Sequence, residues 1–341
     1  MKLRQNSHPS LPKNSKQLLC TPSTCAYNVK TVAGGEYFHF GIQAHIAKCV
    51  VTRVEQMKLK VNVDGLPLFK SSGLQFWPIL GMFDGVDVEP FLIGLYCGFS
   101  KPTNANEFLQ DFVTEAKQLY SEGVQHGDSV LPFSISSIIC DAPARAFVKC
   151  TKNFSGYSGC DKCVQSGTWI NGIKYPLTDA PLRTDGTFAL MEDEDHHVSK
   201  TILSELPLGL VSKVPLDYMH FLCLGVTRKL LLLWMKGPLP TRQPSRVIKN
   251  ISDAYVSQKT HYPAEFARRP RPLSDIDRWK ATEFREFLLY GGPLAICANI
   301  PDQLYQHFLL LFVAIRILAS PSLCYTSVSY THLTLPTKRI V

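Results

Sequence analysis

Three carboxylates lie at positions where clustered acids could hold divalent metal ions. Asp64 follows the alternating segment MKLKVNV and Asp141 follows the apolar segment PFSISSIIC, so each is expected at the end of a β-strand. Glu283 lies in KATEFREF, which has the pattern of a helix. Clustered carboxylates repel one another unless cations neutralise them, and hard oxygen ligands favour Mg²⁺ or Mn²⁺. Two such ions could activate water or a 3′-hydroxyl for attack on a phosphodiester.

Each acid also has an ordinary structural interpretation. Asp64-Gly65 is a common turn dipeptide, and Asp141 precedes Ala-Pro in the manner of a helix cap. Glu283 could be a solvated helix residue, and Glu286 competes with it on the same helix. Spacing alone therefore leaves a structural role open for all three acids.

A second group of residues has the chemistry of a zinc site. Cys160 and Cys163 form a C-x-x-C pair in a glycine-rich segment, which suits two thiolates on one tetrahedral ion. A redox pair is the alternative, although no thioredoxin-like βαβ context surrounds it. Because the pair supplies two ligands, a third is needed, and His220 is the first candidate; its alternative is a core histidine. The weaker candidates are His196, His197 and His261.

Basic residues just before Glu283 could follow a DNA backbone. The formal net charge of +8 and the pI of about 8.9 suit a polyanionic partner without requiring one. A solvated loop is the alternative for any single basic residue. The candidate DNA-binding residues are Arg268, Arg269, Arg271 and Lys280.

The bulk composition is that of a globular chain. The 341 residues, 45% of them hydrophobic, suffice for one large domain or two ordinary ones. The 11 cysteines are not expected to form disulfides, because the first twenty residues lack a signal-peptide pattern. No stretch reaches the roughly 20 apolar residues of a membrane-spanning helix, so we expect no membrane partner.

The order of expected elements indicates the fold class. Strands at 57–65, 75–83 and 88–98 precede a helix within 101–123, a strand leading into Asp141, and a further helix. This order predicts an α/β (α+β) fold of the RNase H-like type, with a mixed sheet and flanking helices. In that arrangement the first and fourth strands are neighbours, so Asp64 and Asp141 would face one crevice.

The chain divides by pattern into five segments. The helix from 278 to 293 is expected to end at its Gly-Gly-Pro sequence, and the final segment lacks any packing pattern and is expected to be non-native. The segments are a linker-like 1–31, a first core part at 32–150, an insertion with the cysteine pair at 151–277, final core helices at 278–325, and the tail 326–341.

Five motifs in order carry a resemblance to a known family. The chain resembles the transposase-domain proteins of animal genomes, which are similar to CACTA/EnSpm-type DDE transposases. The resemblance covers most of residues 8–325. The motifs are VDGLPLFKSS (63–72), CDAPARAFVKC (140–150), GYSGCDKC (156–163), PLDYMHFLCLGV (215–226) and RWKATEFREFLLYGGP (278–293).

The resemblance implies a catalytic core that cuts and joins DNA with two aspartates and a third acid. Asp64 and Asp141 match the first two, and Lys280-Ala-Thr-Glu283 is loosely similar to the element around the third; Asp217 is its rival. A cysteine pair at this distance after the second aspartate also occurs in the related Transib transposases and the V(D)J recombinase core. By that analogy the insertion is mostly helical and carries zinc. In those zinc-bearing relatives, two histidines lie close before the third acid. In this sequence only His261 lies near that position.

The function expected from the resemblance is divalent-metal-dependent nicking and strand transfer of DNA in the nucleus, with a homo-oligomer as a further expectation. One alternative is a domesticated or decayed copy that binds DNA or protein without catalysis. Another is a zinc-stabilised interaction module whose acids are incidental. Metal binding at the acids and cleavage of DNA would separate the three hypotheses.

Overall fold

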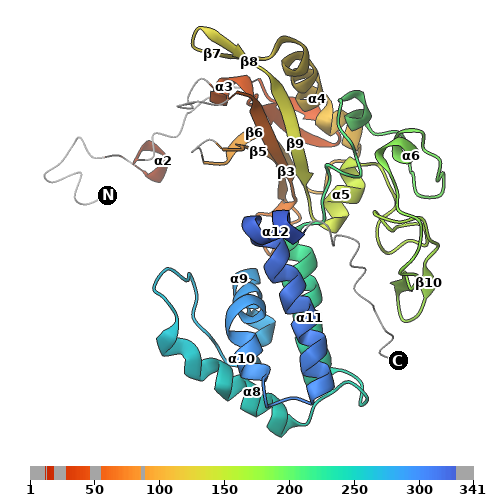
Figure 1. Cartoon of the computed structure of the whole chain (residues 1–341). Helices are drawn as coiled ribbons and strands as arrows, with labels where there is room; N and C mark the ends of the chain where they lie inside the picture. The colour runs from red at the N-terminus through yellow and green to blue at the C-terminus, as the bar shows by residue number, and fades with distance from the viewer. Residues whose placement is uncertain (1–11, 13, 19–27, 47–54, 86–88, 328–341) are drawn as a thin grey trace, which may run out of the picture. The chain divides into compact units, whose positions relative to one another are not determined.

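The computed structural model describes residues 12, 14–18, 28–46, 55–85 and 89–327. Most of the expected tail at 326–341 therefore lies outside the described residues. Contacts between residues divide the chain into two units, which are treated separately below. One unit comprises Met1–Met57 with Gly65–Phe133, and the other comprises Lys58–Asp64 with Ser134–Val341 (Figure 1).

The strands form a mixed sheet in the order β1-β2-β6-β5-β3-β9, with β4 paired to β5. In the first unit all pairings are antiparallel, and the predicted strands at 75–83 and 88–98 are confirmed, the second beginning at Phe91 among the described residues. The hairpin of β1 and β2 was not predicted and begins inside the linker-like segment. The bounds are β1 (Lys30–Val32), β2 (Gly35–His39), β4 (Leu66–Pro67), β5 (Gln75–Phe83) and β6 (Phe91–Gly98).

Helix α4 (Ala105–Glu122) packs on β2 and β6, as the apolar stripe from Phe108 to Leu119 predicts. The Asn104 side chain accepts hydrogen bonds from two amides of the first turn, and Gly123 follows the last residue with a φ of 75°. A short hairpin, β7 (Val124–His126) and β8 (Ser129–Leu131), then precedes β9. The helix predicted within 101–123 is thus confirmed.

Strands β3 (Met57–Val63) and β9 (Phe133–Ile139), which belong to the second unit except for their first residues, are neighbours. Ser136 Oγ donates to the Leu59 carbonyl at 3.3 Å, and Asn62 Nδ2 donates to the Ile139 carbonyl at 2.8 Å. Because the contact positions rise together along both strands, the pair is parallel, as predicted for the fourth strand. Helix α5 (Ala142–Val148) starts directly after β9.

Residues 151–216 differ from the expectation of a mostly helical insertion. Their proline- and glycine-interrupted sequence yields loops and four short elements instead, because no apolar run is long enough for a packed helix. The longer helices of the insertion begin only at Tyr218. The short elements are β10 (Thr168–Trp169), β11 (Ile173–Lys174), α6 (Asp185–Ala189) and the 3₁₀-helix η1 (Ile202–Glu205).

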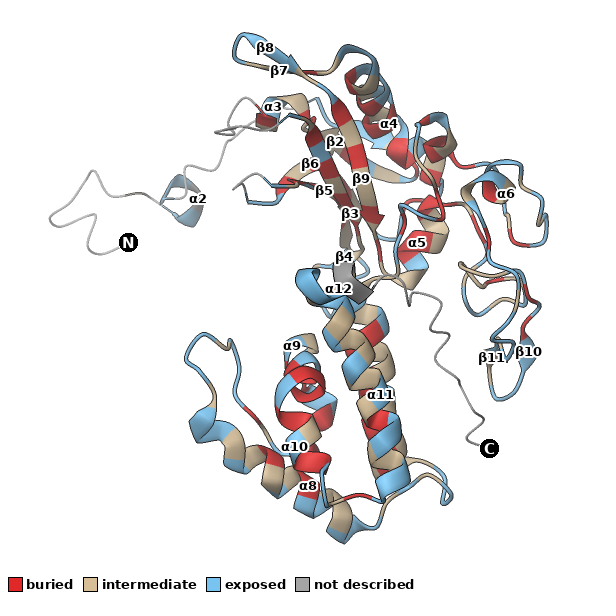
Figure 2. Ribbon diagram, viewed as in Figure 1, coloured by how far each residue is buried: buried red, intermediate tan, exposed pale blue. Residues whose placement is uncertain are grey.

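The remainder of this unit is helical and has its own apolar core, which includes Trp234, Tyr255, Trp279, Phe287 and Phe308. Figure 2 shows the buried residues of α10 in red. The helices are π-helix η2 (Tyr218–Thr227), α7 (Arg228–Lys236), α8 (Ser245–Ser257), the 3₁₀-helices η3 (Gln258–His261) and η4 (Leu273–Arg278), α9 (Ala281–Glu286), π-helix η5 (Phe287–Gly291), α10 (Gly292–Ile296), α11 (Asp302–Leu318) and α12 (Pro321–Ser327).

The expected helix stop at Gly-Gly-Pro was wrong. The chain continues through η5 into α10, with Pro293 in the first turn of α10. The preceding π-turn, in which the Gly292 amide bonds to the Phe287 carbonyl, provides the adjustment that accommodates this proline. Among the described helices, none is both long enough and apolar enough to cross a membrane.

Candidate functional site

Asp64 and Asp141 follow the carboxyl ends of the neighbouring parallel strands β3 and β9. Cys140, which precedes Asp141, is buried, and its thiol is hydrogen-bonded to the backbone of Val63, which precedes Asp64. Burial raises the pKa of that thiol to about 12, and the negative charges of Asp141 and Asp64 act in the same direction. Both aspartates are half-buried. The sheet order confirms the prediction that these two strands are neighbours, and the shared crevice for the two carboxylates stays a prediction.

Asp217, the rival for the third acid, lies at the same edge. A parallel bridge joins Cys140 to Leu216, and the Ile138 amide donates to the Lys213 carbonyl at 2.9 Å. The segment before Asp217 therefore runs beside β9 in the same direction. Since Asp141 and Asp217 each follow a bridged residue, they occupy equivalent positions on adjacent segments.

The side chains of these two aspartates are also helix caps. Asp141 accepts from the Ala144 amide at 2.7 Å, which confirms the capping alternative as one of its roles. Asp217 accepts from the Met219 and His220 amides at the start of η2. Within the described ranges, no three histidine, cysteine, aspartate or glutamate side chains are placed to hold one metal ion. The three acids thus follow adjacent backbone segments, but their side chains do not form a group that could hold one metal ion.

The Glu283 carboxylate is hydrogen-bonded to the Arg271 side chain and to the backbone of Lys280. Its carboxylate receives Arg271 Nε at 2.5 Å and Nη2 at 2.9 Å, and the Lys280 amide at 2.7 Å. The side chain is 3% exposed. Since the described residues contain no metal-holding group of three acids, Glu283 is not assembled with Asp64 and Asp141. Its present contacts are those of a buried ion pair that caps α9.

The four basic residues expected to bind DNA divide into two kinds. Arg271 is committed to Glu283 and to the Arg278 carbonyl, so it is a structural residue here. Arg268, Arg269 and Lys280 are exposed, and a DNA backbone could reach them.

Cys160 and Cys163 lie together, with their sulfur atoms 3.1 Å apart. Two thiolates on one zinc ion, each at about 2.3 Å, are separated by about 3.8 Å, so a small opening of the pair would fit the ion. His220 does not form a metal-holding group with them among the described residues, and its Nδ1 is hydrogen-bonded to the Asp217 carboxylate. Burial raises the pKa of Cys163, which disfavours its thiolate unless a cation is present.

His196, which ranked among the weaker candidates, has the local chemistry of a zinc ligand. It is fully buried, and its Nδ1 lies 2.7 Å from the carbonyl oxygen of Ser158, two residues before Cys160. Its Nε2 is buried and has no hydrogen-bond partner. Burial lowers the pKa of this imidazole to about 4, so the ring is neutral at pH 7. A neutral imidazole with Nδ1–H on a carbonyl offers its Nε2 lone pair.

A pocket of about 590 Å³ adjoins the carboxylate edge. It extends from Ala142, which follows Asp141, to Asp217 and the outer face of η2, and the Cys160 turn forms another wall. Arg145, Lys152, Lys162 and Lys229 line it, together with Asp161 and the aromatic side chains of Phe154, Tyr175 and Phe221. This pocket could not be predicted from sequence patterns, because its walls come from three separate segments.

A buried ion cluster supports one side of the pocket. Lys149, which is fully buried, lies 2.5 Å from Asp161, and Lys162 and Arg145 lie 3.4 and 3.5 Å from the same carboxylate. Although burial raises the pKa of Asp161, these cations outweigh it and the net shift is downward. Lys162 Nζ also donates to the carbonyls of Val211 and Val214.

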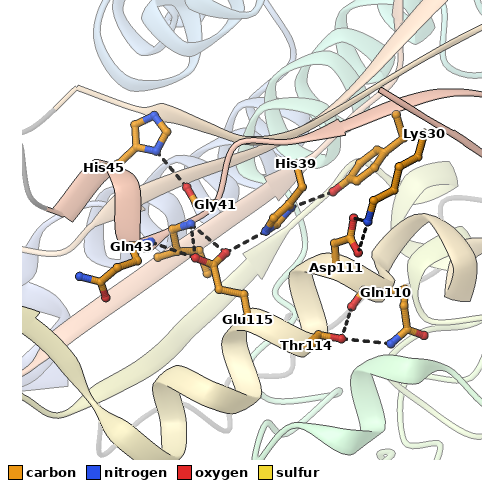
Figure 3. Close-up of polar contacts among 11 residues, drawn as sticks. Lys30, His39, Gly41, Gln43, His45, Gln110, Asp111, Thr114 and Glu115 are labelled. Carbon is orange, nitrogen blue, oxygen red and sulfur yellow. Dashed lines mark hydrogen bonds and ion pairs between the residues drawn. The ribbon is translucent and has the colours of Figure 1, made fainter. Parts of the chain in front are cut away.

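In the first unit, Glu115 is the centre of a different polar network (Figure 3). Its carboxylate lies 2.9 Å from His39 Nε2 and accepts from the amides of Ile42 and Gln43. His39 Nδ1 lies 3.1 Å from the hydroxyl of Tyr37. Since Tyr37 is 1% exposed, this chain of hydrogen bonds ends inside the unit and ties α4 to the segment after β2.

Comparisons of the chain with models of protein families and with curated proteins find no match.

Proposed function

We propose that this chain is the catalytic region of a DDE-type DNA transposase, which nicks DNA and transfers the freed strand with Mg²⁺ or Mn²⁺. The observation that carries the proposal is the position of Asp64 and Asp141 directly after two adjacent parallel strands, where both charges act on the Cys140 thiol. Two carboxylates at one edge can share divalent ions, which would polarise a phosphodiester and activate its attacking oxygen.

The order of elements supports an RNase H-like interpretation of the mixed sheet. Strands β5 and β6 are an antiparallel pair, α4 follows them in the chain, and β9 lies beside β3. The bridged segment ending at Leu216 adds a further parallel neighbour. The fold alone does not determine the activity, so the proposal rests on the acids at the edge.

For the third acid we favour Asp217 over Glu283. The backbone of Asp217 lies beside that of Asp141, whereas the carboxylate of Glu283 is already neutralised by Arg271. A rotation of the Asp217 side chain away from its capping position would direct it toward the edge. Metal ions would favour that rotation, because they relieve the repulsion among the acids.

The proposal includes a structural zinc ion at Cys160 and Cys163, and a nuclear protein that binds DNA as a homo-oligomer. Arg268, Arg269 and Lys280 would contact the DNA backbone in this scheme. Zinc would stabilise the loop-rich segment after α5, which has few long elements of its own.

The test is Mn²⁺-dependent nicking of supercoiled plasmid by the purified chain, beside Asp64→Ala and Asp141→Ala. We expect nicking by the unchanged chain and its loss in both variants, with their melting temperatures retained. Exposed Asp253→Ala serves as a matched control and should nick normally. Equal nicking by all four proteins would exclude the carboxylate site.

A second candidate is a DNA- or protein-binding module without catalysis. It is favoured by the capping roles of Asp141 and Asp217, which occupy both carboxylates in the structure. This candidate predicts DNA binding that is indifferent to Mn²⁺ and to either Asp→Ala substitution, together with an absence of nicking.

A further inference from the structure

We propose that the pocket beside Asp141 and Asp217 holds one unpaired nucleotide, with its base against the aromatic side chains and its phosphate at the basic rim. This inference rests on the proposed function and deepens it, since it specifies the DNA structure that the site selects. The pocket starts at Ala142, one residue after Asp141. A nucleotide joined to a phosphodiester at the carboxylate edge would therefore lie within reach of it.

The charge of the pocket suits a phosphate. Four lysine and arginine side chains and two aspartates line it, which leaves an excess of two positive charges among these six residues. The charge of Asp161 is further offset by the buried Lys149 behind it. Lys162 is held by two backbone carbonyls, so the rim cations free to meet a ligand are Lys152 and Lys229. Lys152 has only a 3.7 Å pair with the exposed Asp195, and Lys229 is exposed on α7.

The aromatic residues of the pocket suit a base. Phe154 and Phe221 are 55% and 53% exposed although both line the pocket, so their rings offer faces that the protein does not cover. Tyr175 donates to the Gly156 carbonyl at 2.6 Å, which fixes the loop that carries Phe154. Bases stack on such rings with little dependence on sequence, and lysines beside them attract the backbone.

The size and position of the pocket favour an unpaired nucleotide over duplex DNA. About 590 Å³ is within the range of roughly 300–1,000 Å³ found for small-molecule pockets, and a double helix does not fit such a space. A base inside a duplex is stacked on both faces and must leave the helix to reach an aromatic wall. We therefore expect preference for DNA with an unpaired nucleotide at the cleavage position.

The experiment measures binding of the full chain to two fluorescent probes in Ca²⁺. One probe is a DNA duplex with a single extrahelical 2-aminopurine, and the other is the same duplex with 2-aminopurine paired. We expect tighter binding and stronger quenching for the first probe. Phe221→Leu should reduce the preference about tenfold, the order expected for loss of one stacked base, whereas Phe221→Trp should retain it.

Lys229→Gln should weaken binding to the extrahelical probe and reduce its salt dependence. Phe99→Leu and Lys259→Gln are matched exposed controls outside the pocket and should bind like the unchanged chain. The inference is overturned if Phe221→Leu keeps the full preference, or if both controls reduce it equally.

The nicking assay distinguishes failure of this inference from failure of the proposed function. Phe221-dependent preference without any Mn²⁺-dependent nicking would support the pocket and contradict the transposase activity. Nicking that depends on Asp141, with no preference for the extrahelical probe, would support the activity and overturn the inference. Absence of binding to either probe would contradict both.

Discussion

Asp217 lies beside Asp141 because the residues before them, Leu216 and Cys140, form a parallel bridge. Each aspartate also caps the helix that follows it. Two junctions, each with an aspartate that ends an extended segment and caps a helix, therefore lie next to each other. Without metal, a carboxylate at such a junction can accept hydrogen bonds from the helix amides. With metal present, the same carboxylate can rotate to bind the cation. The pair is therefore suited to a site that forms around its ions.

The first prediction concerns Asp217→Asn. If Asp217 is the third metal ligand, this change should reduce Mn²⁺-dependent nicking at least a hundredfold, since even residues around a metal's ligands contribute about 10–100-fold to metal affinity. Asparagine can still cap η2, so the fold should be retained. Nicking rates across a Mn²⁺ titration check this, with Asp253→Asn as the control. Unchanged rates would assign the third acid elsewhere.

The second prediction concerns Glu283→Gln. The change removes the buried partner of Arg271, which is itself about one-third exposed, and should lower the free energy of unfolding by about 1–3 kcal/mol. Urea denaturation measures this loss, and Arg271→Gln should produce a similar loss that is not additive with the first. Additive losses of stability would contradict the ion pair. A loss of nicking in a fully stable Glu283→Gln protein would support Glu283 as the third catalytic acid.

The strand and helix positions near the acids could be predicted because local pattern determines them. The alternation of 57–63 and the cap and stripe around α4 are properties of short sequence windows. The neighbouring positions of Asp64 and Asp141 then followed from the order of elements.

The third acid and the pocket could not be predicted in the same way. The bridge between Cys140 and Leu216 joins residues that are 76 positions apart in the sequence. The segment LVSKVPLDY has no alternating pattern that would predict an extended segment beside β9. Glu283 matched a motif, but its pairing with Arg271 depends on how the loop before η4 folds back. The sequence also could not rank His196 first among the candidate zinc ligands, since only the structure shows that its Nε2 is buried without a partner.

The third prediction concerns the pH dependence of stability due to Glu286. Burial raises the pKa of this carboxyl to about 7, and the nearby charge of Glu283 acts in the same direction. Because the folded state holds the proton more tightly than the unfolded state, stability should fall as the pH rises from about 4.5 to about 7. Glu286→Gln should remove this slope and stabilise the chain at pH 8 by about 1–2 kcal/mol. Urea midpoints between pH 5 and 8 measure the slope, and exposed Glu265→Gln should leave it intact.

The fourth prediction has the opposite sign and concerns Glu115. Burial opposes ionisation, but hydrogen bonds from His39, Gln43 and Ile42 outweigh it and lower the pKa of Glu115. Its contribution should therefore be present above about pH 4.5 and be lost as the pH falls through the lowered pKa. Glu115→Gln should cost about 1–3 kcal/mol at pH 7 and less at pH 3. Thermal unfolding at both values measures the difference, with exposed Glu122→Gln on the same helix as the control. An equal cost at both pH values would show that shape, not charge, stabilises this contact.

The last prediction concerns zinc. If Cys160 and Cys163 hold a structural ion, the purified chain should contain about one zinc per molecule, and a chelator should lower its melting temperature. Cys160→Ser should lose the metal, and His196→Ala should lose it more fully than His220→Ala, because only His196 has a buried, unpartnered Nε2. Elemental analysis of each variant measures this, with buried Cys223→Ser as a thiol control outside the pair. Full zinc content in His196→Ala with loss in His220→Ala would instead support the ligand set first expected from the sequence.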